Sequence, residues 1–198
     1  MVHINNLKHI TMKIKYLLLT VFSVFLLSSF VTDVQKYITK TGTIEIFSQT
    51  PVFTIEGVNK KVASILNVET GEVVVSTLIR SFKFEEALVE EHFNENYMES
   101  HKFSKAIFKG KIVNFKSIDF KKDGKYDIVI EGKLTIHGET NLVKENGTLE
   151  IKGDNITANT EFSVSLEKYK IEVEKSYKDA IKDDILLKIH FDYKPYTK

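Results

Sequence analysis

Histidines and acids are the side chains of this sequence best suited to chemistry, and several fall in one stretch, Glu90 to Lys111. His92 and His101 lie there among glutamates, whereas His137 and His190 lie in separate strand-like segments. Protein metal sites gather histidine and carboxylate ligands, and helical zinc sites use spacings such as HExxH. Neither HxH nor HExxH occurs, so surface or hydrogen-bonded histidines are preferred and no metal site is predicted.

Nucleophilic catalysis has little support in the residue types. The chain has no cysteine, no GxSxG motif and no glycine-rich phosphate loop. Glu85, Glu86, Glu90 and Glu91 cluster, but acids are favoured at the start of a helix because they complement its dipole. We therefore predict no catalytic residue, no cofactor and no enzymatic activity.

Arg80 is the only arginine of the chain, and it alternates with Leu78 and Phe82. An inward-facing arginine could hold a ligand carboxylate or phosphate through two parallel hydrogen bonds. A charge at a strand end or on an outer face is the alternative, and it is the preferred interpretation.

Aromatic side chains are dense around the same stretch. They are Phe82, Phe84, Phe93, Tyr97, Phe103, Phe108 and Phe115. An isoprenoid or acyl chain needs a long apolar tunnel, because each buried unpaired polar group is costly. Packing between a short helix and a sheet is the alternative, and it is favoured at any single position.

The elements that would position these residues are one helix and many strands. Glu85 to Met98 shows helical spacing, since Leu88 and His92 are four residues apart, as are Glu91 and Glu95. We predict a short helical insertion near residues 85–99. A lid, a plug and a simple connection are the roles open to it.

From Thr41 onward, apolar and polar residues alternate in the period of two that marks strands with one buried face. The apolar faces are Tyr126, Ile128, Ile130, Leu134 and Ile136; Ile156, Ala158, Thr160, Phe162, Val164 and Leu166; and Ile185, Leu187, Ile189, Phe191 and Tyr193. Glycine-containing turns are expected at Asp123-Gly124, Asn146-Gly147 and Gly153-Asp154, because tight hairpins need positive φ. The charged segment Lys168 to Asp184 reads as a solvated edge or loop.

About eight long antiparallel strands with short turns can form a sandwich or a closed barrel. The length of the strands and the hairpin turns favour an all-β, up-and-down barrel. A barrel of this size has an interior just wide enough for side chains or one slender ligand.

The N-terminal residues 1–31 have the pattern of a secretory signal peptide. Lys13 and Lys15 precede an apolar run from Tyr16 to Val31, and Met12 is a candidate for the true start. An uncleaved anchor is the alternative. We expect a periplasmic or secreted protein in which residues 32–198 form a single domain.

Charge argues against two classes of partner. The whole chain carries a net charge of +1, and loss of residues 1–31 removes three lysines and leaves a net charge of −2. A nucleic-acid-binding protein would present a basic surface, so no nucleic-acid partner is predicted. Anionic membrane surfaces are likewise not expected to bind the chain by charge alone.

Several segments of the chain are distinctive when taken together: Lys36 to Asn59, the pair Thr70-Gly71, SFKFEEALVEEHFNENYMES at 81–100, FKGKI at 108–112 and EGKLTIHGET at 131–140. They resemble the YceI-like family, and in particular its Bacteroidetes-type members. The resemblance implies a lipocalin-like antiparallel β-barrel that is exported to the periplasm and holds a polyisoprenoid or similar long-chain amphiphile.

The function expected from this resemblance is non-enzymatic sequestration or transport of a polyisoprenoid, isoprenoid quinone or lipid inside the barrel. The candidate ligand-contacting residues are Leu78, Phe82, Phe93, Tyr97, Phe103, Phe108, Leu134 and Phe162. The alternative is a side-chain-filled barrel that docks an envelope protein or a second copy of this chain. An enzyme acting on a lipophilic substrate is the third hypothesis.

Overall fold

The computed structural model describes residues 35–49, 54–173 and 183–196. The predicted signal segment therefore lies outside the described residues. The strands are β1 (Lys36–Gln49), β2 (Thr54–Asn67), β3 (Glu72–Leu78), β4 (Lys83–Phe84), β5 (Lys105–Ile112), β6 (Gly124–Ile136), β7 (Glu139–Lys152), β8 (Asn155–Ser165) and β9 (Asp184–Pro195). No helix in these ranges is long and apolar enough to cross a membrane.

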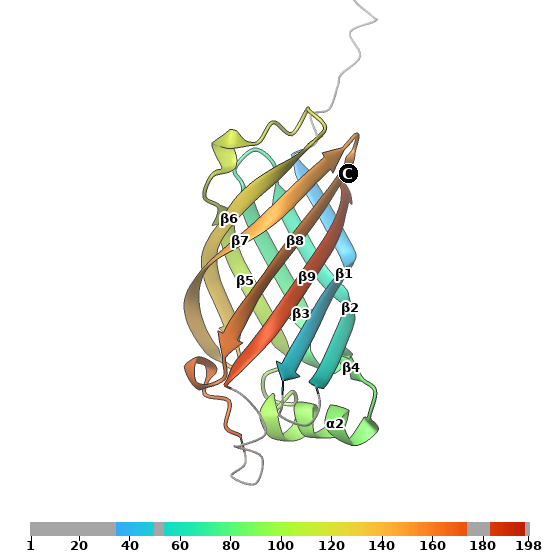
Figure 1. Ribbon diagram of the computed structural model, residues 1–198, viewed down its shortest axis with the longest axis vertical. Helices are drawn as coiled ribbons and strands as arrows, with labels where there is room; N and C mark the ends of the chain where they lie inside the picture. The colour runs from blue at the N-terminus through green and yellow to red at the C-terminus, as the bar shows by residue number, and fades with distance from the viewer. Residues whose placement is uncertain (1–34, 50–53, 174–182, 197–198) are drawn as a thin grey trace, which may run out of the picture. The chain divides into compact units, whose positions relative to one another are not determined.

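The strands close into a single antiparallel barrel (Figure 1). The order around the sheet is β1-β9-β8-β7-β6-β5-β3-β2, and pairing of β1 with β2 closes the wall. The two-residue strand β4 adds only two pairs to β2 and is not a further stave of the barrel. The predicted fold class is thus confirmed: an eight-stranded closed barrel rather than a sandwich.

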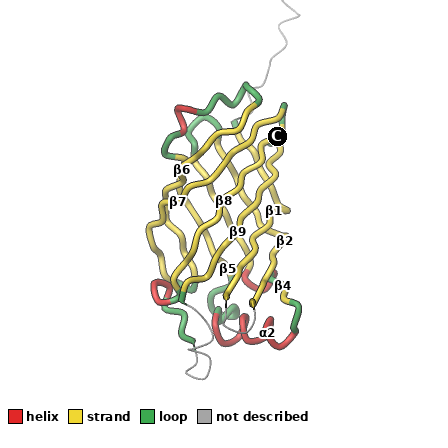
Figure 2. The backbone as a smooth tube through the Cα atoms, in the orientation of Figure 1, coloured by secondary structure: helices red, strands yellow, loops and turns green. Residues whose placement is uncertain are grey.

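The predicted helical insertion is also confirmed. It comprises the helix α2 (Ala87–His92) and the π-helical turn η2 (Phe93–Tyr97), which follows α2 directly. Figure 2 shows that helical segments occur at the ends of the barrel, with strands forming the wall between them. The insertion covers one end, which we call the lid end.

One of the expected turns is wrong. Asn146 and Gly147 lie inside the long strand β7, where Gly147 pairs with Thr160 of β8. A Cβ atom on Gly147 would lie 2.7 Å from the carbonyl oxygen of Asn159, so the two backbones approach too closely for any larger residue. The glycine serves a close strand contact rather than a turn.

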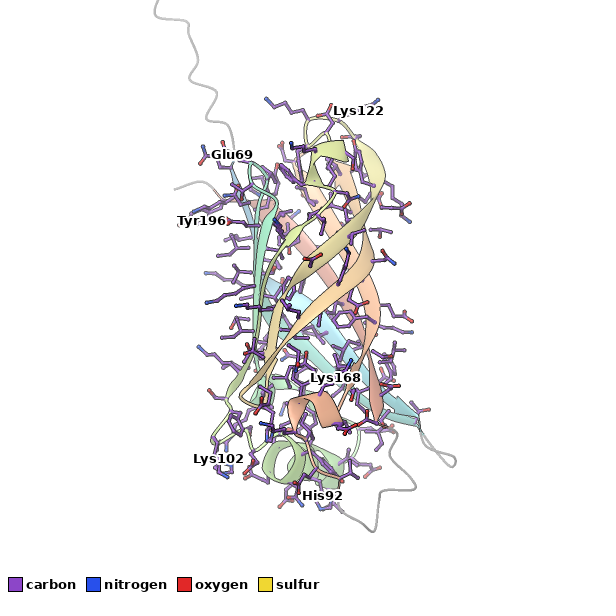
Figure 3. The ribbon with its side chains drawn as sticks, turned by 90° about the vertical axis from the view of Figure 1, so that its left-hand side faces the viewer. Glu69, His92, Lys102, Lys122, Lys168 and Tyr196 are labelled. Atoms are coloured by element: carbon purple, nitrogen blue, oxygen red, sulfur yellow. The ribbon has the colours of Figure 1, made fainter. Side chains whose placement is uncertain are left out.

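The end opposite the lid is filled with side chains, and we call it the filled end. Figure 3 places Glu69, Lys122 and Tyr196 at this end and His92, Lys102 and Lys168 at the lid end. The rings of Phe115 and Phe120, from the segment between β5 and β6, lie 5.5 Å apart and pack against the buried core. Several buried residues fill this end and border no cavity: Tyr37, Val62, Ile118, Ile151 and Ile156. Leu66, Val73 and Tyr193 are also buried here but line the cavity described below.

Candidate ligand-binding site

The interior is hollow from the lid end as far as Leu66, Val73 and Tyr193, near the filled end. It contains a cavity of about 410 Å³, lined by inward-facing residues of the barrel strands together with residues of α2 and η2. Aliphatic and aromatic side chains make up most of this lining. Most residues of the predicted apolar faces of β6, β8 and β9 border this space, which follows from the alternation of side chains along a strand; Tyr126 and Ile156 do not.

The lid end of the cavity is covered by aromatic packing. The Phe93 ring on η2 lies 5.5 Å from the ring of Phe82 and 4.9 Å from the ring of Phe84. Tyr97 and Met98 complete this cover and also border the cavity. Tilted aromatic pairs at such spacings stabilise a packed surface beyond the area they bury. The insertion therefore acts as a cover for the cavity, not only as a connection.

Six of the eight candidate ligand-contacting residues border the cavity. They are Phe82, Phe93, Tyr97, Phe108, Leu134 and Phe162. They come from strands, from the insertion and from the segment that precedes it, so the fold brings together residues that are far apart in sequence. Contact with a ligand is not tested by this placement and stays a prediction.

The other two candidates lie elsewhere. Val73, Val75 and Thr77 of β3 border the cavity, so Leu78 takes the opposite parity and is 49% exposed. Phe103 packs edge-on against His137, with ring centroids 4.4 Å apart. Gly138 has a positive φ in the neighbouring turn, and a Cβ atom on this residue would lie only 2.7 Å from the ring of Phe103. Phe103 thus stabilises a turn outside the cavity.

Three features of the cavity were missed by sequence reasoning. Ile171 and Val173 border the cavity although they belong to the charged segment expected to be a solvated loop; residues 174–182 of that segment lie outside the described residues. Glu145 borders the cavity on β7. The inward parity of Glu145 with Val143 and Leu149 was the available signal, and the mistaken turn at Asn146-Gly147 concealed it.

Polar atoms on the cavity wall are few, and several are bonded into the wall. Tyr193 Oη lies 2.6 Å from Ser64 Oγ, and burial raises the pKa of this phenol. Thr77 Oγ1 accepts a hydrogen bond from Asn59 at 2.8 Å. Ser48 Oγ is buried and has no partner among the described residues, and burial raises the pKa of Glu145. The cavity thus offers little polar chemistry.

Arg80 does not enter the cavity. Its Nε donates to Ser100 Oγ at 3.1 Å, and its Nη2 lies 3.6 Å from a carboxylate oxygen of Glu95. Because both charged side chains are more than half exposed, this pair contributes little to stability. The interpretation of Arg80 as an outward-facing charge agrees with this geometry.

Of the described histidines, His137 and His190 make hydrogen bonds, His101 lies 3.8 Å from a carboxylate oxygen of Glu95, and His92 borders the cavity. His137 Nε2 lies 3.1 Å from Glu99 Oε2, and hydrogen bonds from Lys102 and then His137 hold the Glu99 pKa below its usual value. His190 bonds to Asn159 at 2.7 Å. Among the described residues, no group of three or more histidine or acidic side chains is arranged to hold a metal ion.

One protein-family model matches the chain over nearly the whole barrel. The model of the YceI-like domain matches residues 27–193. No curated protein sequence matches the chain significantly.

Solved structures share the fold at low sequence identity. A polyisoprenoid binding domain from Saccharophagus degradans, implicated in plant cell wall breakdown, aligns with a TM-score of 0.72 and 10% identity. The alignment covers 83% of this chain and 100% of that domain. BcnA from Burkholderia cenocepacia aligns with a TM-score of 0.65 and 16% identity over 76% of this chain and 95% of its own. A YceI protein from Campylobacter jejuni aligns with a TM-score of 0.55 and 15% identity over 71% and 85% of the respective chains.

Proposed function

The chain belongs to the family of YceI-like domains, and from that premise we propose that it binds one long apolar molecule in its barrel. The ligand would be a polyisoprenoid, an isoprenoid quinone or a lipid, held without covalent chemistry. The similar domain from Saccharophagus degradans is described as polyisoprenoid binding, and this supports the choice of ligand class.

The observation that carries the proposal is the apolar cavity under the lid. Its volume of about 410 Å³ is within the range of ligand pockets, roughly 300–1,000 Å³. Removing an apolar chain from water into such a space is favourable in proportion to the area buried. Binding by this route requires no catalytic group, which supports a role as carrier, store or protector rather than enzyme.

Docking of a protein through the insertion is less well supported. That alternative requires exposed aromatic residues on the insertion, but Phe93 and Tyr97 are partly buried and border the cavity. An envelope protein partner or a second copy of the chain stays a prediction without a surface to carry it.

We also propose that the protein is exported. The basic and apolar pattern of residues 1–31 supports this. N-terminal sequencing of the protein from fractionated cells would test it, and a cytoplasmic protein that retains residues 1–31 would contradict it.

Filling the cavity tests the binding function directly. Ala106 lies on β5 and borders the cavity, whereas Ala63 lies on the outer face of β2. Binding of all-trans-retinol, a fluorescent isoprenoid alcohol, would be measured with delipidated protein. We expect Ala106→Phe to weaken binding about tenfold or more, which corresponds to about 1.4 kcal/mol, and Ala63→Phe to leave it unchanged. Absence of retinol binding to the parent protein would contradict the proposal.

A further inference from the structure

The barrel wall has a lateral gap between β7 and β8. The two strands pair from Gly147 to Lys152 on β7 and from Asn155 to Thr160 on β8. Towards the lid end both strands continue, but within the described residues no ladder pair joins 142–146 to 161–165. In Figure 1, β6 and β7 bow outward together while β8 continues beside β9.

The gap has a definite frame, and we call it the window. At its upper border, on the side of the filled end, Thr160 Oγ1 donates to the carbonyl oxygen of Asn146 at 2.7 Å. At its lower border, on the side of the lid end, Asn141 Nδ2 donates to the carbonyl oxygen of Lys168 at 2.8 Å. This bond links the short helix η4 (Glu167–Tyr169) to β7. The window is therefore closed above and below by hydrogen bonds.

Both sides of the window belong to the cavity wall. Val143 and Glu145 of β7 and Phe162 and Val164 of β8 all border the cavity and are all partly exposed. Where β7 and β8 are paired, Leu149 borders the same cavity but is only 1% exposed, as is Ile156. The cavity wall is therefore more exposed at the window than beside it. A chain in the cavity can thus reach the wall at this position.

The window combines apolar sides with hydrogen-bonding groups. Backbone N–H and C=O groups that a neighbouring strand would normally satisfy lie along both edges, and such groups bind polar partners. Glu145 adds a carboxyl group that faces inward beside Val143. A polar head group attached to an apolar chain would satisfy these groups while the chain stays in the cavity.

The charges around the window disfavour an anionic head group. Glu145 lies on one side and Glu161 on the other. The neighbouring lysines are already engaged, because Lys144 Nζ lies 3.4 Å from Glu131 and Lys188 Nζ lies 4.0 Å from Glu161. A phosphate or carboxylate placed here would be repelled by Glu161, and it would also oppose any ionisation of the Glu145 carboxyl group. Lys168, at the lower border, is exposed and does not border the cavity.

We infer that the window between β7 and β8 holds the polar end of the ligand, and that this end is a neutral hydrogen-bonding group such as a hydroxyl or a carbonyl. This inference rests on the proposed function and specifies the ligand of the same cavity. Burial raises the pKa of Glu145, in keeping with a carboxyl group that is costly to charge in this place.

Competition with bound retinol tests the inference. The competitors are geranylgeraniol and geranylgeranyl phosphate, which share one chain and differ in their head group. We expect the alcohol to compete about tenfold more strongly than the phosphate, a difference of about 1.4 kcal/mol. Glu145→Gln should reduce this preference several-fold. Glu150→Gln, the same charge change on the exposed face of β7, should leave it unchanged.

Each result separates the inference from the function it rests on. Equal or stronger competition by the phosphate in the parent protein would overturn the inference while leaving apolar binding intact. A preference that Glu145→Gln and Glu150→Gln change equally would overturn the role of the window. Failure of retinol to bind the parent protein would overturn the proposed function and the inference with it.

Discussion

The filled end and the lid end of this barrel use the same strands with different outcomes. At the filled end, Ile151 and Ile156 of the β7–β8 hairpin are 2% and 1% exposed and border no cavity. At the lid end, residues of the same inward faces, such as Val143 and Phe162, are partly exposed and border the cavity. Strand alternation alone therefore does not decide whether a barrel interior is filled or hollow.

Two differences between the ends account for this. The filled end keeps β7 and β8 paired and receives Phe115, Ile118 and Phe120 from the segment before β6. At the lid end, β7 and β8 separate and the insertion covers the space from outside. Side chains that reach inward from a connecting segment fill the barrel, whereas a cover that lies across its end leaves room beneath.

The largest expected effect compares equal truncations at the two ends. Ile156→Ala should reduce the free energy of unfolding by about 2–5 kcal/mol, because it opens a void in a close-packed region. Ile136 borders the existing cavity at the lid end, and Ile136→Ala should reduce the free energy of unfolding by only about 1–2 kcal/mol, because fewer contacts are lost. Urea unfolding measures both variants, and equal losses would show that the lid end is as tightly packed as the filled end.

A smaller effect on stability, but a larger one on binding, is expected from the lid. The double variant Phe93→Ala, Tyr97→Ala removes the aromatic cover while leaving the wall strands unchanged. We expect a folded barrel by circular dichroism that releases retinol several-fold faster than the parent. Loss of the folded state would instead show that these rings belong to the structural core.

The smallest expected effect is on the pH dependence of unfolding. Burial raises the pKa of Glu145, so the folded protein binds this proton more strongly than the unfolded chain does. Protonated Glu145 therefore contributes to the free energy of unfolding. This contribution is fully present below the pKa of Glu145 in the unfolded chain and is lost as the pH rises through its pKa in the folded protein.

Glu145→Gln provides the matched comparison for this pH effect. All other titrating groups are common to both proteins, so the difference in unfolding free energy isolates Glu145. The variant should gain stability relative to the parent as the pH rises from about 4 to about 7. If the unfolding free energies of the parent and of Glu145→Gln differ by the same amount at every pH in this range, burial does not raise the pKa of Glu145.

The fold was predictable because it depends on local patterns. Alternation along 156–166 and 185–193 gives the inward faces without any long-range information. The helical insertion was likewise visible in the spacing of Leu88 and His92. The length of the strands and the hairpin turns favoured the barrel over the sandwich, and the resemblance of the 81–100 and 131–140 segments to a known family implied the same fold.

The site was predictable only in part, because its shape depends on contacts between distant strands. Leu78 is the last residue of β3 and faces outward, and the 3-10 turn at Ile79–Ser81 breaks the alternation that would have placed it on one face with Phe82. Nothing in its residue type reveals this. Glu145 was hidden because Asn-Gly in a strand and Asn-Gly in a turn look alike until the partner strand is known. The separation of β7 and β8 between Gly147 and the lid end likewise depends on how distant strands pair, so the sequence pattern does not predict it.

The most direct test of the central claim is mass spectrometry of an organic-solvent extract of the protein purified from its native host. Occupation of the lid end by a long apolar ligand predicts a neutral, long-chain compound in near-stoichiometric amount. The extract of the Ala106→Phe variant should contain far less of it. An extract of the parent protein that contains no such compound, together with a delipidated protein that fails to bind retinol, would contradict the claim.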